Sequence, residues 1–158
     1  MINIRNGFTL IELIVVMGLI GIMLAVSSLE FSSMQKSFGV ERVTRELMSD
    51  ISEYRVKAMT RKEPHSITLS ANEYVFRRNT SQVLKRATPY PLSDQNANPF
   101  SGATVIIFDE QGFTGSGALF GQTIVVGPAN SSSSVNCVVI SNARVNMGKM
   151  NGTTCEFK

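Results

Sequence analysis

A glutamate, Glu12, stands inside an otherwise apolar N-terminal stretch, where a carboxylate needs a chemical reason. From Leu13 to Val26 the chain runs for fourteen residues without a charged side chain, and Leu29 and Phe31 extend the apolar stretch. A carboxylate at the centre of a membrane helix costs about 2.5 to 3.5 kcal/mol, less near an end, and such groups are usually paired. Glu12 therefore requires either a cationic partner near the start of the stretch or a position from which it reaches the lipid headgroups.

A small residue, Gly7, precedes this stretch and offers a source for that partner. An ordinary secretory signal has its small-residue cleavage site after the apolar region, whereas Gly7 comes before it. Cleavage between Gly7 and Phe8 would keep the apolar helix on the mature protein and would create an amine at Phe8. Glu12 would then be the fifth residue, one helical turn from the amine of its own chain.

The segment "GFTLIEL" and the apolar run behind it resemble the prepilin signature of type IV pilins and type II secretion pseudopilins. The resemblance rests on Gly7, Phe8, Thr9, Leu10, Ile11 and Glu12. It implies that a prepilin peptidase removes residues 1–7 as a leader and that Phe8 becomes N-methylated. It also implies that residues 8–31 anchor the subunit in the inner membrane and later pack into a filament core. There, Glu12 of one subunit would meet the Phe8 amine of its neighbour.

Charge sets the expected orientation of the chain. Arg5 and the N-terminal amine precede the apolar stretch, and positive charge holds that end in the cytoplasm, so the remaining chain should face the periplasm. After residue 31 the chain has 15 − 1 = 14 Lys and Arg against 12 − 2 = 10 Asp and Glu, a net charge of +4. This mild basic excess only weakly indicates a polyanionic partner.

The helix is predicted to continue beyond the membrane as an amphipathic half, residues 32–63, which should end before Pro64. Apolar residues at spacings of three and four predict one apolar stripe: Val40, Val43, Leu47, Ile51, Tyr54 and Ala58. The opposite face is predicted to lie in water with these charged residues: Glu41, Arg42, Arg45, Glu46, Asp50, Glu53, Arg55 and Lys57.

After Pro64 the periodicity changes to that of strands. Strands are predicted at 66–70, 73–78, 82–86, 104–109, 122–127, 136–141 and 143–147, with a hairpin turn at Ala71 and Asn72 and a surface loop at 87–102. The predicted fold class is α+β: a β-rich domain, 64–158, whose antiparallel sheet packs on the apolar stripe of the long helix in a type IV pilin-like arrangement.

The C-terminal half resembles the globular domain of GspH/FimT-type minor pilins and pseudopilins, in "FDEQGFTGSG", "VVIS" and "NARVNMGK". The expected function is therefore that of a low-copy structural subunit, assembled with other pilin subunits by an inner-membrane assembly platform. The alternative is a DNA-binding minor pilin for natural transformation. Members implicated in DNA uptake carry a late Gly-Arg-x-Arg segment, whereas here Ala143 precedes Arg144 and Asn146 replaces the second arginine. The candidate DNA contacts are Arg144 and Lys149, with Arg77, Arg78, Lys85 and Arg86 as further candidates.

The two cysteines, Cys137 and Cys155, fit an exported domain. A disulfide between them would span 17 intervening residues and, in an oxidising periplasm, would contribute about 3 kcal/mol to stability. The alternatives are two unpaired thiols or a metal pair, but with His65 as the only histidine the cysteines make a poor zinc site.

The sequence indicates no enzyme, because it shows neither a nucleophile with its base nor paired carboxylates at a recognisable spacing. No cofactor or metal is expected. Asp109 and Glu110 flank a glycine turn and could offer oxygen ligands to calcium, although an ordinary turn explains them as well. The sequence leaves open whether the chain serves a pilus or a secretion system.

Overall fold

The computed structural model describes residues 8–114 and 122–157, without the side chains of residues 26–30 and Ala103. The predicted leader, residues 1–7, therefore lies outside the described residues, together with the Gly7 cleavage position.

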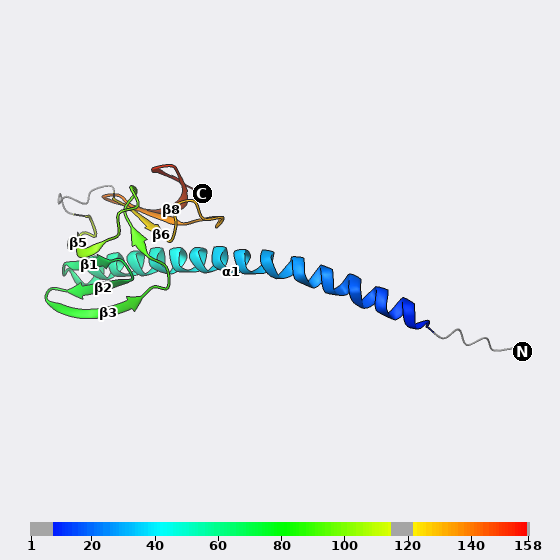
Figure 1. Ribbon diagram of the computed structural model, residues 1–158. Helices are drawn as coiled ribbons and strands as arrows, with labels where there is room; N and C mark the ends of the chain where they lie inside the picture. The colour runs from blue at the N-terminus through cyan, green and yellow to red at the C-terminus, as the bar shows by residue number, and fades with distance from the viewer. Residues whose placement is uncertain (1–7, 115–121, 158) are drawn as a thin grey trace, which may run out of the picture. The chain divides into compact units, whose positions relative to one another are not determined.

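The chain forms two compact units, Met1–Lys36 and Ser37–Lys158, which are described separately. One helix, α1 (Leu10–Arg61), begins in the first unit and ends in the second (Figure 1). It ends where the sequence predicted. Lys62 adopts a left-handed φ of 54°, the conformation that commonly follows a last helical turn, and Pro64 cannot continue the helix.

Two antiparallel sheets form the β-rich part of the second unit. The first has the order β3-β2-β1-β5, with β1 (His65–Ser70), β2 (Glu73–Arg78), β3 (Ser81–Ala87) and β5 (Ser101–Phe108). The second has the order β4-β6-β7-β8-β9, with β4 (Leu92–Ser93), β6 (Gln122–Val126), β7 (Cys137–Ile140), β8 (Val145–Asn151) and β9 (Thr154–Phe157). The predicted α+β class is confirmed.

Most predicted strands are present, but three details of the prediction are wrong. The segment 143–147 begins too early, because the Ser141 N–H donates to the Arg144 carbonyl at 2.8 Å and closes a turn before β8. The predicted loop 87–102 contains the short strand β4 and the start of β5. The last strand, β9, was not predicted. It forms a tight hairpin with β8 through a turn at Gly152, and a strand of four residues is too short to show an alternating pattern.

The predicted apolar stripe of α1 is buried along its whole length and forms the centre of the core. Residues from both sheets pack against it, among them Ile67 and Phe76 from the first sheet and Ile124 and Ile140 from the second. A smaller cluster combines Val125, Met150 and the two cysteines. The stripe therefore positions both sheets on the second unit's part of α1.

One residue assigned to the solvated face of the helix is buried. Asp50 is only 6% exposed, although its neighbours Glu53 and Arg45 remain accessible. Its position is explained by polar partners from the first sheet. The Tyr74 hydroxyl donates to Asp50 Oδ2 at 2.8 Å, and Arg86 Nε lies 2.8 Å from the same oxygen. A buried carboxylate with two such donors is satisfied, and helical spacing alone could not predict them.

Candidate assembly site

The described part of the predicted assembly site is the start of α1, with Phe8 and Glu12. Phe8 is 80% exposed, and Glu12 is exposed in the first helical turn. The Glu12 N–H donates to Oγ1 of Thr9 at 3.3 Å, which is an N-cap interaction. A carboxylate in the first turn also interacts favourably with the helix dipole. Thr9 and Glu12 also have the spacing of a capping box.

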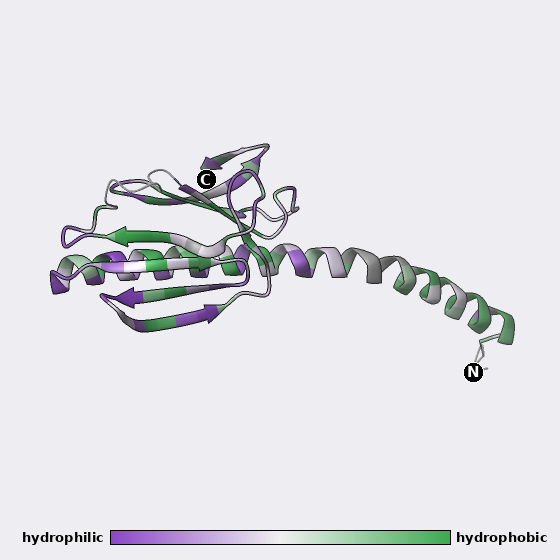
Figure 2. Cartoon of the chain, turned by 60° about the vertical axis from the view of Figure 1, so that its left-hand side comes forward, coloured by the Kyte–Doolittle hydropathy of each residue, from purple (hydrophilic) through white to green (hydrophobic). Residues whose placement is uncertain are grey.

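Large apolar side chains around and after Glu12 are exposed, and Figure 2 shows that the first turns of α1 are mostly hydrophobic. They are Leu10, Ile11, Leu13, Ile14, Val15, Val16, Met17, Leu19, Ile20, Ile22, Met23 and Leu24. In the described residues, no helix combines the length and the apolar character needed to cross a membrane. Side chains 26–30 of the predicted span 8–31 lie outside the described residues.

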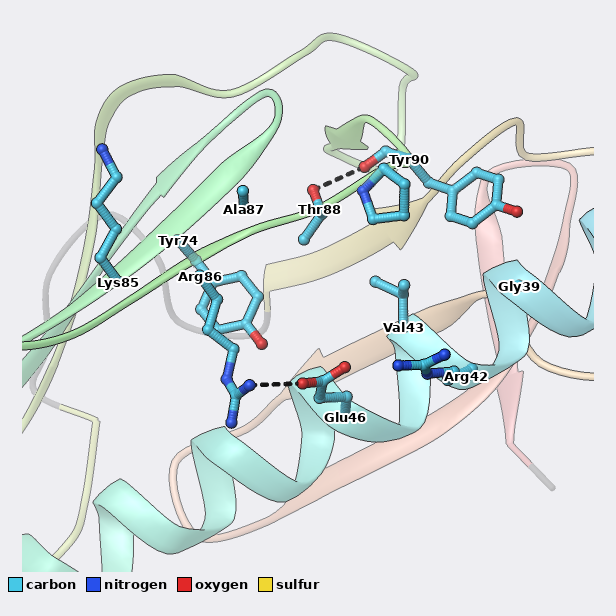
Figure 3. A pocket seen from close by; sticks show the side chains of 11 residues that line it. Gly39, Arg42, Val43, Glu46, Tyr74, Lys85, Arg86, Ala87, Thr88 and Tyr90 are labelled. Atoms are coloured by element: carbon cyan, nitrogen blue, oxygen red, sulfur yellow. Dashed lines mark hydrogen bonds and ion pairs between the residues drawn. The ribbon is translucent and has the colours of Figure 1, made fainter.

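Tyr74 and Arg86, the two partners of Asp50, line a cavity of about 480 Å³ between α1 and the segment from Lys85 to Tyr90 (Figure 3). Arg86 bridges Asp50 and Glu46, the latter at 2.8 Å. The field of the Asp50 carboxylate raises the pKa of Arg86, while burial and the hydrogen bond to Asp50 raise the pKa of Tyr74 far above its ordinary value. Tyr74 therefore remains a protonated donor, and the cluster serves as an internal polar support.

At the other end of this cavity, Tyr90 packs over Gly39. A Cβ at Gly39 would overlap with the Tyr90 hydroxyl, so the glycine makes room for the Tyr90 side chain in this position.

The two main candidate DNA contacts are not brought together. Arg144 lies in the turn before β8, whereas Lys149 lies in β8 opposite Glu156 of β9. The five residue steps between them correspond to about 17 Å of extended chain. Arg144 and Lys149 therefore do not form one compact site with two charges.

Three of the four further candidates are engaged in ion pairs. Lys85 pairs with Glu73 at 2.7 Å, Arg86 with Asp50 and Glu46, and Arg78 with Glu63 at 3.7 Å. Arg77, which is exposed, forms no ion pair with any described residue. These partners neutralise three of the six basic side chains that were candidates for contact with a polyanion.

The predicted disulfide between Cys137 and Cys155 is present, with a Cα–Cα distance of 6.1 Å. Both sulfurs belong to buried residues, and the bond links β7 to β9 across β8. The alternatives of free thiols and of a metal pair are excluded for these two residues.

The turn after β5 uses its carboxylate internally. Asp109 Oδ1 accepts hydrogen bonds from the backbone N–H groups of Gln111 and Phe113, at 2.9 and 2.8 Å, which supports an ordinary turn. His65 is buried, with Nδ1 2.9 Å from the Glu63 carbonyl. In the part of the chain that the structure describes, no three His, Cys, Asp or Glu side chains gather as metal ligands.

Sequence reasoning missed one pairing of functional interest. Arg55, assigned to a solvated helix face, lines a groove together with Arg144. The two residues are 89 positions apart (144 − 55), so no spacing in the sequence could associate them.

Comparison with known proteins agrees with this architecture. Residues 2–28 match a family model described as the prokaryotic N-terminal methylation motif. The structure is similar to the crystal structure of the type IV minor pilin FimU of Pseudomonas aeruginosa (strain PAO1), with a TM-score of 0.54 and 11% sequence identity. The alignment covers 80% of this chain and 96% of the FimU chain. No curated protein matches the chain in sequence. The chain thus carries the N-terminal methylation motif that "GFTLIEL" predicted, on a fold like that of a type IV minor pilin, as the segments of the C-terminal half predicted.

Proposed function

We propose that the chain is a minor pilin or minor pseudopilin, a structural subunit that enters a type IV pilus or a type II secretion pseudopilus. One observation carries this proposal: an N-terminal methylation motif at residues 2–28 precedes a FimU-like fold. In this function the second unit presents surfaces to other pilin subunits, and the apolar part of α1 acts first as an inner-membrane anchor and then as filament core.

Processing prepares the subunit. A prepilin peptidase cleaves between Gly7 and Phe8 and the new amine of Phe8 is methylated. Both events occur on the cytoplasmic side of the inner membrane, because Arg5 and the amino terminus hold that end there. The second unit lies in the periplasm, where the Cys137–Cys155 bond is stable.

Charge pairing then drives entry into the filament. Lipid tails are as apolar as the side chains of a helix core, so moving the exposed apolar residues from lipid into protein yields little hydrophobic free energy. An unpaired carboxylate in that environment is costly. Pairing of Glu12 with the Phe8 amine of the neighbouring subunit removes this cost only after docking. The inner-membrane assembly platform brings the two subunits together.

Intact-mass measurement and filament shearing test this function. The wild-type chain should begin at methylated Phe8 and appear in sheared filaments. Gly7→Val should retain residues 1–7, because a branched side chain does not fit where the motif offers a glycine. Glu12→Leu should be processed and membrane-inserted yet absent from filaments. Glu53→Gln, which also removes one exposed carboxylate of α1, is the matched control and should enter filaments normally.

Two results would refute the proposal: a mature wild-type chain that does not start at Phe8, or normal incorporation of the Glu12→Leu subunit. The genes beside this one, if they encode a secretin, a retraction ATPase or other minor pilins, would distinguish a pilus from a secretion system. The DNA-uptake alternative requires salt-sensitive duplex binding. We expect the full-length chain to bind duplex DNA weakly or not detectably at physiological salt, because its basic side chains are dispersed or paired.

A further inference from the structure

A groove of about 420 Å³ opens between the last turns of α1 and the turn that leads into β8. The helix contributes Ser52, Arg55, Val56 and Met59, and the opposite wall consists of residues 143–146. All of these residues belong to the second unit. The groove therefore joins two arginines, Arg55 and Arg144, that come from opposite ends of the domain sequence.

Arg55 is held in position by a neutral acceptor. Its Nε–H donates to the Gly112 carbonyl at 2.8 Å, and among the described residues no carboxylate forms an ion pair with it. The same turn provides Asp109, whose Oδ1 is occupied by two backbone N–H groups. The terminal amino groups of Arg55 thus keep their hydrogen-bonding capacity for an anion, in an orientation that the Nε bond maintains.

Arg144 faces the groove from an anchored backbone. Its carbonyl accepts the Ser141 N–H at 2.8 Å, while its exposed side chain forms no ion pair within the described part of the chain. The lining contains no acidic residue, and the sequence of residues 115–121 contains none either. Arg86, in the cavity of Figure 3, differs from these two arginines because it is paired with Asp50 and Glu46.

The groove also has an apolar component between its two cationic walls. Val56 is 52% exposed, and Met59 and Val145, which are partly exposed, complete this surface. The exposed valine can pack against an aliphatic or aromatic side chain of a bound segment. The two arginines beside it can bind the carboxylate of the adjacent residue in that segment. The volume accommodates side chains of a protein segment rather than a helix or a strand.

We propose that this groove docks a segment of a neighbouring filament subunit in which an aspartate or glutamate stands next to an apolar residue. The proposal rests on the proposed function. The carboxylate receives hydrogen bonds from Arg55 and Arg144, and the apolar side chain covers Val56 and Met59. A protein segment explains the groove better than nucleic acid does, because two arginines supply few phosphate contacts and a phosphate backbone leaves the apolar surface uncovered.

Site-specific photo-crosslinking in filament-producing cells tests the proposal with the full-length chain. The photoreactive phenylalanine analogue benzoylphenylalanine replaces Val56, and the crosslinked peptide is identified by mass spectrometry. The expected product joins position 56 to a peptide of another filament subunit that contains an aspartate or glutamate beside an apolar residue. Arg144→Gln and Arg55→Gln should each reduce the yield about tenfold, as expected for loss of one charge-assisted hydrogen bond.

Arg77→Gln is the matched control, because it removes another exposed arginine without an ion pair to a described residue, and it should leave the yield unchanged. Charge exchange provides a second measurement: Arg144→Glu should lose the contact, and reversal of the partner's acidic residue to arginine should restore it. Circular dichroism confirms that each variant is folded.

The proposal is overturned by an unchanged yield in Arg144→Gln, by a crosslinked peptide without a carboxylate, by failure of the charge exchange, or by no crosslink from wild-type-like filaments. Duplex DNA binding that Arg144→Gln abolishes would assign the groove to DNA and also overturn it. If the wild-type chain is absent from filaments, the proposed function fails and the docking proposal fails with it. If the chain is present and the crosslink is absent, only the docking proposal fails.

Discussion

The two parts of α1 are both rich in apolar residues, but they distribute them differently. In the first part, large apolar side chains from Leu10 to Leu24 occur on all sides and are exposed. In the second, apolar residues from Val40 to Ala58 form a single buried stripe, and most of the other faces are charged. A helix that is apolar on all sides needs an apolar environment around it, whereas a helix with one stripe needs one packing surface.

The difference shows where each part obtains its partner. Both sheets cover the stripe within the same chain. The second part of the helix therefore finds its whole packing surface within one subunit. The environment of the first part must come from outside the described residues. In the proposed function, lipid supplies it first and neighbouring helices supply it afterwards.

The largest expected effect compares equal truncations in the two parts. Leu47→Ala should lower the free energy of unfolding by about 2 to 5 kcal/mol, because Leu47 is fully buried and its truncation leaves a cavity. Leu19→Ala, at a position 55% exposed, should change it by less than about 0.5 kcal/mol. Denaturant unfolding in detergent, followed by circular dichroism, measures both. Equal destabilisation would show that the first part also packs within the chain.

The disulfide should give the next largest effect, and only in the second unit, which contains both cysteines. Replacing Cys137 and Cys155 by serine should reduce stability by about 3 kcal/mol, because the unfolded chain gains conformational freedom. Reduction of the wild-type chain with dithiothreitol should lower the unfolding midpoint to a similar extent and should not lower that of the double variant. An unchanged midpoint on reduction would contradict the entropic account.

Two carboxylates of α1 sharpen the comparison between buried and exposed charge. Asp50→Asn should cost about 1 to 3 kcal/mol, because Tyr74 and Arg86 lose a buried charged acceptor. Glu53→Gln, whose partner Lys57 is partly exposed, should cost at most about 0.5 kcal/mol. Tyr74→Phe combined with Asp50→Asn completes a double-mutant cycle. Additive losses would mean that the hydroxyl and the carboxylate do not cooperate.

The smallest expected effect is the loss of stability at low pH that comes from Asp94, in the loop between β4 and β5. Burial raises the pKa of Asp94, but hydrogen bonds from Asn98 and Asn96 outweigh it, so this pKa lies below its ordinary value of 3.8. A depressed folded-state pKa stabilises the protein above the unfolded-state pKa, and this contribution disappears as pH falls through the folded-state value. Stability should therefore decline as pH falls below about 4. Asp94→Asn should show a smaller decline in acid unfolding measurements, and an identical decline would exclude this contribution.

Local pattern was sufficient for the long elements. The helix end before Pro64, the apolar stripe, the first hairpin and the pairing of the cysteines were all predicted, because each follows from periodicity, from proline geometry or from a simple count. Prediction failed where the partner is remote in sequence. Asp50 has the helical position of a solvated residue, and its burial depends on Tyr74 and Arg86.

The sequence by itself determined the methylation motif, the all-round apolar start of α1 and the α+β class, because these depend on residue type and on spacing along one element. Only the tertiary structure decided the rest. It separated Arg144 from Lys149 along β8, placed Arg144 opposite Arg55 across a groove, and paired three of the other basic candidates with carboxylates. The physical reason is that a charge acts through its neighbours in space within a few ångströms, and those neighbours are set by the packing of two sheets on one helix.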